Sequence, residues 1–259
     1  MKNPEEFDCH QVKLDLIQSI IEMPCIEIEK YSLVDFFFNY RLSEQQVVCM
    51  RNKASKVIFG KDSDVELKDF VIDTTSFKNI NLEFDFVHFC FIDTVSLQTE
   101  LEIPINNLQH TLYYIIINCN KNDLIDFDFN SVAYNAYIVN DSNVLQKITL
   151  TNDDYANIRN RFLTRVGSTI RQNTTFNAIT EYITFSAKKV KDFRNELPSN
   201  STFNVRLICI DKNCNINSPS QEVTDYLSQS RNQNRLSLAF QKINTVGPGD
   251  YYDIGNMQP

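Results

Sequence analysis

Histidine and cysteine side chains are the first candidates for chemistry in this chain. There are three histidines, His10, His88 and His110. Cys90 or Cys119 could act as a nucleophile with His88 or His110 as its general base. Cys90 lies two residues from His88, so on a strand both side chains point to the same face. A small buried thiol beside a core histidine gives the same pattern, and we adopt that interpretation. We therefore predict no catalytic residue and no enzyme activity.

The cysteines do not have the spacing of a metal site. The chain has seven of them, scattered along its length. Cys209 and Cys214 are the closest pair, but no second pair of Cys or His residues complements them, as a zinc site requires. An odd number of scattered cysteines in a chain without a signal peptide favours reduced thiols. We predict no metal ion and free cysteines.

Glycine is scarce, which bears on nucleotide binding. There are five glycines, and none lies between Gly60 and Gly167. Loops that bind phosphate groups need glycine so that backbone N–H groups can approach the ligand. The sequence contains no Walker loop, no dinucleotide-binding fingerprint and no nucleophile elbow. We predict no cofactor.

Carboxylates occur in pairs two residues apart, as in Glu83 with Asp85 and Asp126 with Asp128. Such pairs could bind a cation or perform acid–base chemistry. The same spacing is typical of the solvent-facing side of an amphipathic strand. We interpret the pairs as strand surface.

Basic residues are concentrated between positions 159 and 194. That segment holds only two acids, Glu181 and Asp192, in a chain whose net charge is −8. A basic patch attracts phosphate groups or an acidic surface, and the rest of this chain is itself acidic. Another copy of the protein is therefore the predicted partner, with nucleic acid as the alternative and a solvated helix face as the third interpretation. The predicted patch consists of Arg159, Arg161, Arg165, Arg171, Lys188, Lys189, Lys191 and Arg194.

Hydrophobic periodicity from about residue 65 onward indicates strands. Leu82–His88, Leu101–Ile105 and Ile125–Phe129 alternate apolar and polar residues with period two. Thr111–Ile117 is a strongly apolar stretch and is typical of a strand buried on both faces. Strands at such short spacing favour a β-sandwich. We predict a mainly β fold with an N-terminal helix and one or two amphipathic helices.

Two helices stand out from this pattern. Gln11–Met23 carries apolar residues on one face and ends before Pro24. Thr151 is a suitable N-cap for a second helix, which we expect to end at Gly167. For Glu44–Met50 the pattern leaves a short helix and a strand open. No internal repeat is evident.

The simplest partition has three parts: a helical extension at 1–40, a β-rich domain at 41–244 and an extended arm at 245–259. Tyr251 and Tyr252 make the arm aromatic, and we expect it to pack against a neighbouring subunit.

The sequence also bears on location. Met1–His10 is acidic and polar, unlike a signal peptide. No apolar run approaches the ~18–20 residues that a membrane span requires. We expect an intracellular protein, in the cytoplasm or nucleus of a host cell or in a virion, with no membrane span.

Part of the chain resembles the jelly-roll capsid proteins of large and Polinton-like double-stranded DNA viruses. Ile103–Asn106, Thr111–Ile117, Phe127–Asn130 and Ala136–Asn140 follow the order of an "IP" strand, an apolar strand, an "F-x-F-N" segment and a strand ending in Asn. The family has Gly after that Asn, whereas this chain has Asp141. The composition is also similar to that of insect-virus occlusion proteins. The resemblance implies a jelly-roll sandwich that assembles into a shell or lattice, with no catalytic residues.

Three functions follow from these observations. The first is a viral structural protein that self-assembles through contacts between subunits. The second is a non-enzymatic module that binds nucleic acid or a host protein through the 159–194 segment. The third is an enzyme of unfamiliar type with His88 or His110 in a cleft.

Overall fold

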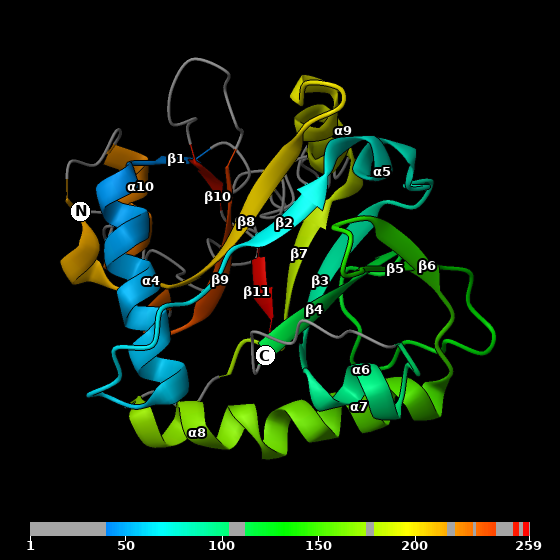
Figure 1. Cartoon of the computed structure of the whole chain (residues 1–259), viewed down its shortest axis with the longest axis horizontal. Helices are drawn as coiled ribbons and strands as arrows, with labels where there is room; N and C mark the ends of the chain where they lie inside the picture. Colours follow the sequence, from blue (N-terminus) through cyan, green and yellow to red (C-terminus); the bar gives the residue numbers. More distant parts are fainter. Residues whose placement is uncertain are drawn as a thin grey trace, which may run out of the picture.

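The computed structural model describes residues 40–103, 112–174, 179–216, 221–229, 232–241, 251–253 and 256–258. It shows two antiparallel β-sheets with helices packed around them, a mixed α/β architecture with a β-rich core (Figure 1). The helix predicted at Gln11–Met23 lies outside the described residues.

Both sheets consist of antiparallel strand pairs. Sheet A contains, in spatial order, β1 (Tyr40–Leu42), β10 (Tyr251–Asp253), β9 (Leu236–Gln241), β8 (Thr202–Cys209) and β2 (Phe70–Asp73). Sheet B contains β11 (Asn256–Gln258), β7 (Tyr182–Ser186), β3 (Phe86–Asp93), β4 (Leu112–Cys119), β5 (Asn135–Val139) and β6 (Leu145–Ile148).

Helices connect most of these strands. Ser43 and Thr151 each form a capping box at the start of a long helix, which satisfies N–H groups that have no partner within the helix. The segment at Glu44–Met50 is thus helical. The helical elements are α4 (Glu44–Phe59), α5 (Thr74–Asn79), α6 (Val95–Thr99), α7 (Asn152–Thr164), α8 (Val166–Asn173), α9 (Ala187–Glu196), the 3₁₀ turn η1 (Lys212–Cys214) and α10 (Gln221–Ser228).

Aromatic side chains fill the space between the two sheets. Phe89 of β3 and Phe185 of β7 contact Phe240 of β9, with ring centroids 5.3 and 5.6 Å apart. Phe70 of β2 meets Tyr114 of β4 edge-on at 4.8 Å. Each such pair contributes about 0.5–1.5 kcal/mol beyond the burial of its apolar area. The two sheets therefore share one core.

The loop between β4 and β5 covers the other face of sheet B. It includes Ile125–Phe129, so the prediction of a strand there was wrong. Phe127 and Phe129 lie in edge contact at 4.7 Å, and Phe129 also packs on Tyr155 of α7. An extended segment laid over a core buries alternate side chains just as a strand does. Period-two alternation alone does not distinguish the two.

Gly167 does not end the helix that begins after Thr151. The chain turns briefly at Arg165 and continues as α8, with Gly167 inside it. A Cβ at Gly167 would lie 2.8 Å from Cδ1 of Ile179. Glycine here leaves room for the end of the Ile179 side chain and does not mark a helix terminus.

The chain runs twice through the same order of elements, although the sequence shows no evident repeat. The first half is β1–α4–β2–α5–β3–α6–β4–β5, and the second is β6–α7/α8–β7–α9–β8–η1/α10–β9–β10. In sheet A the middle strands β10, β9 and β8 come from the second half, and the flanking β1 and β2 come from the first. Sheet B has the reverse composition, with β11 added beyond β7. The two halves are thus intertwined by exchange of strands.

Ion pairs recur at equivalent positions of the two halves. Arg51 of α4 pairs with Asp69, the residue before β2, at 2.8 Å. Arg159 of α7 pairs with Glu181, the residue before β7. Both arginines lie eight residues after their capping Ser43 or Thr151.

Contacts between the halves are also reciprocal. Lys78 of α5 donates from Nζ to the carbonyl oxygen of Leu197 at 2.7 Å, just after α9. Arg194 of α9 donates from Nη1 to the carbonyl oxygen of Ile80 at 3.0 Å, just after α5. Such exchange of roles indicates a twofold pseudo-symmetry axis between α5 and α9.

Candidate functional site

One face of α4 is exposed along its length. Glu44, Val48, Asn52 and Lys56 follow one another at intervals of four residues, which places them in one row on a helix. All four are exposed, and Val48, a large apolar residue, is 46% accessible. We call this row the α4 stripe.

A groove of about 670 Å³ lies between α4 and the segment 211–216. Its apolar part is formed by Val48 and by Ile216, which is 43% exposed, together with Cys49 and Cys214. Exposed large hydrophobic residues that gather at a concavity are typical of an interaction site.

The two cysteines of the groove form a disulfide bond, Cys49–Cys214. The prediction of free cysteines was wrong for this pair. The residues are separated by 165 positions, so no local spacing could indicate their pairing. The bond fixes η1 to α4 and holds the groove walls in place. Cys209, which the sequence placed near Cys214, is a buried free thiol whose pKa is raised to about 12 by burial.

Charges of both signs surround the groove. Lys53 of α4 pairs with Asp211 at 3.4 Å. Glu44 and Lys56 lie at opposite ends of α4, and their side chains have no polar partner among the described residues. The formal charges of these four residues cancel in a chain whose net charge is −8. The groove is therefore a neutral region of an acidic protein.

The equivalent row on α7 differs. Counted from the N-cap Thr151, the counterparts of the α4 stripe are uncharged: Asn152, Ala156, Asn160 and Thr164. Of these two equivalent rows, the one on α4 therefore combines charged ends with a large exposed apolar residue, and the one on α7 does not.

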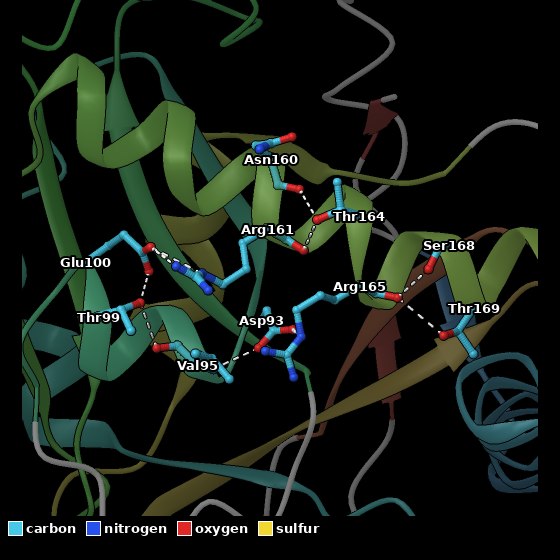
Figure 2. A network of polar contacts seen from close by, with 10 residues as sticks. All are labelled: Asp93, Val95, Thr99, Glu100, Asn160, Arg161, Thr164, Arg165, Ser168 and Thr169. Atoms are coloured by element: carbon cyan, nitrogen blue, oxygen red, sulfur yellow. Dashed lines mark hydrogen bonds and ion pairs between the residues drawn. The ribbon is translucent and has the colours of Figure 1, made fainter.

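Ion pairs occupy the position that corresponds to the groove, between α7 and the segment that follows β3 (Figure 2). Arg161 of α7 donates from Nε to Glu100 after α6 at 3.1 Å. Arg165 contacts Asp93 at the end of β3 at 3.0 Å. Asp93 also accepts the N–H of Val95, as Asp211 accepts that of Asn213.

The structure does not gather the predicted basic patch into one surface. Arg159, Arg161 and Arg165 form ion pairs within the chain, and Arg194 donates to a backbone carbonyl. Arg171 lies on α8 at one end of the molecule, whereas α9 lies at the other (Figure 1). Within the described ranges the remaining side chains lack a polar partner: Arg171, Lys188, Lys189 and Lys191.

His88 and Cys119 do come close together, with Nε2 and Sγ 3.5 Å apart. Both are buried completely. Burial lowers the pKa of His88 to about 4 and raises that of Cys119 to about 11. An activated nucleophile needs a thiolate, so these shifts oppose catalysis by this pair. Burial also raises the pKa of Cys90 well above its usual value.

One carboxylate of each predicted pair accepts side-chain hydrogen bonds. Asp128 accepts from Ser131 and Asn152, and these bonds lower its pKa. Glu83 accepts from the amide of Asn135 at 3.0 Å. In the part of the chain that the structure describes, no group of three or more His, Cys, Asp or Glu residues could hold a metal ion.

The described part of the predicted C-terminal arm, residues 251–253 and 256–258, lies within the chain's own sheets. Tyr251 and Tyr252 belong to β10, which pairs with β1 on one side and β9 on the other. β11 then joins sheet B beside β7.

Comparison with protein-family models, with curated proteins and with solved structures found no match to this chain. Among the described residues, no helix is long and apolar enough to cross a membrane.

The interaction residues predicted from the sequence are not those that line the groove. Ser43 as an N-cap and the four-residue spacing of the α4 stripe were a readable signal for an exposed helix face. Ile216 and Cys214 offered none, because only the fold brings them to α4.

Proposed function

We propose that this chain is a structural protein that assembles with other copies of itself. The observation that carries the proposal is the groove beside α4. It presents exposed apolar side chains in an electrically neutral setting, on a chain that otherwise repels its own copies by net negative charge.

A viral origin is part of this proposal and rests on the resemblance of residues 95–150 to capsid proteins. The Cys49–Cys214 bond supports an oxidising location, such as a virion surface, more than a reducing cytosol. The jelly-roll part of the resemblance is supported by the two antiparallel sheets alone, since α4, α5, α6, α7 and α9 lie between strands here. The proposal of assembly does not depend on it.

A second candidate function is binding of a polyanion by α9. Lys188, Lys189 and Lys191 lie in the first half of this helix, where its dipole disfavours cations, and no acid occupies its first turn. An anionic partner would offset that repulsion.

Solution mass tests the proposed function. Size exclusion with light scattering, at low and high salt, is expected to show masses above the 30.1 kDa of one chain. High salt should shift the population toward smaller species, because charged residues border the groove. A species of 30.1 kDa at both salts and at high concentration would contradict assembly. Retention on immobilised heparin would then be measured for the α9 lysines.

A further inference from the structure

We propose that a second copy of this chain docks its own α4 antiparallel against the α4 stripe, so that the two copies form a twofold dimer. This inference rests on the proposed function and names the surface that performs it.

The α4 stripe is complementary to itself when reversed. In an antiparallel pair centred on position 50, Glu44 of one copy lies opposite Lys56 of the other, and Val48 lies opposite Asn52. Because a twofold interface contains each contact twice, two Glu–Lys pairs form, one at each end. α4 has 16 residues and is therefore roughly 24 Å long, which spaces the charged ends well apart.

The charged groups of Glu44 and Lys56 are available for contacts with a second copy. Glu44 and Lys56 have no polar partner among the described residues, in contrast to Lys53, which already pairs with Asp211. Antiparallel helices also place the positive N-terminal end of one beside the negative C-terminal end of the other.

The groove supplies the apolar part of the contact. Val48 and Ile216 are 46% and 43% exposed and lie on the same concave surface. A second α4 laid along the stripe covers both residues in each copy. Because the disulfide bond holds η1 against α4, the surface is formed before the partner arrives.

The second half of the chain provides an internal comparison. The α7 row has Asn152 and Thr164 in place of the two charged ends and Ala156 in place of Val48. It offers neither charge complementarity nor a large exposed apolar residue. A docking role is thus predicted for α4 and not for α7.

Charge reversal tests the register. Glu44→Lys alone places two like-charged pairs in the dimer, and Lys56→Glu alone does the same, so each is expected to weaken dimerisation about tenfold at low salt. The double variant Glu44→Lys/Lys56→Glu restores both pairs and should recover wild-type affinity. An equimolar mixture of the two single variants should form a heterodimer, since every pair across it is again of opposite charge.

Two matched variants control for effects on folding. Val48→Asp is expected to abolish dimerisation, whereas Ala156→Asp, at the equivalent exposed position of α7, should leave it unchanged. Circular dichroism melting of every variant separates loss of docking from loss of structure, because both charge reversals also oppose the helix dipole of α4.

The outcomes distinguish the two proposals. If the single charge variants and Val48→Asp assemble as well as the wild-type protein does, α4 docking is contradicted. The proposal of self-assembly is not contradicted by that result. A mixture of folded single variants that forms no heterodimer also contradicts the antiparallel register. A wild-type protein that remains a monomer contradicts both proposals.

Discussion

His88 lies inside sheet B with both ring nitrogens engaged. Nε2 is 2.9 Å from the carbonyl oxygen of Lys121, so it carries the proton and donates. Nδ1, 2.9 Å from Oγ1 of Thr184, then accepts from that hydroxyl. A neutral imidazole satisfies both neighbours, and a protonated one would place an uncompensated charge in a fully buried position. The ring therefore acts as a structural connection between β3 and β7.

Protonation of His88 is expected to destabilise the fold. Its pKa is lowered by burial from 6.5 to about 4 in the native state, so the unfolded chain binds the extra proton first as the pH falls. Stability is therefore complete above pH 6.5 and decreases toward pH 4, by about 2 kcal/mol between pH 7 and pH 5. Urea unfolding at a series of pH values measures this slope.

The variant His88→Gln is the control for that slope. It cannot titrate, so its free energy of unfolding should depend less on pH across the same window, whatever its absolute stability. Equal slopes for the variant and the wild type would show that other groups, such as His10 or His110, cause the dependence.

At the scale of elements, the contact of α4 with η1 depends on a covalent bond between residues far apart in the chain. Cys49 and Cys214 are separated by 165 positions. A crosslink over so long a loop restricts the unfolded chain strongly, and the chain-entropy account gives a contribution of about 5 kcal/mol.

Reduction of Cys49–Cys214 is expected to lower the free energy of unfolding by about 5 kcal/mol, measured by urea titration with and without reductant. The double variant Cys49→Ser/Cys214→Ser should be equally stable in both solutions. Alkylation of the unreduced, denatured protein should leave these two cysteines unmodified. If both are alkylated without reductant, the bond is absent.

Elements with a local signal were predictable, and those set by distant contacts were not. Thr151 as an N-cap predicted the start of α7, and the strongly apolar run at 111–117 predicted β4. The segment with Phe127 and Phe129 was wrongly predicted as a strand, because a loop that lies over a core can bury alternate side chains as a strand does. The groove was missed because Ile216 and the disulfide partner Cys214 reach α4 only through the tertiary fold. The resemblance to jelly-roll proteins did not indicate the helices between strands.

At the scale of the whole molecule, the two halves depend on each other. Each sheet combines strands of both halves, and α5 and α9 exchange reciprocal hydrogen bonds through Lys78 and Arg194. This repeat is not evident in the sequence, because the two halves share the order of their elements and a few ion pairs but no extended run of identical residues. Strand pairing and capping tolerate many residue types, so architecture persists where identity does not.

Cutting the chain in the turn Asn140–Asn143, between β5 and β6, tests this interdependence. Neither half alone is expected to fold as a monomer, since each lacks the strands that flank its own β-meander. The two halves expressed together should co-purify and unfold cooperatively, as followed by circular dichroism. A single half that is monomeric and unfolds cooperatively would contradict the intertwined architecture.

Assembly through α4 is the central claim, and sedimentation velocity over a range of concentrations tests it most directly. Wild-type protein is expected to shift with concentration from 30.1 kDa toward twice that mass, whereas Val48→Asp remains at 30.1 kDa throughout. Wild-type protein that stays at 30.1 kDa at the highest concentration, or a folded Val48→Asp that shifts as the wild type does, would contradict the claim.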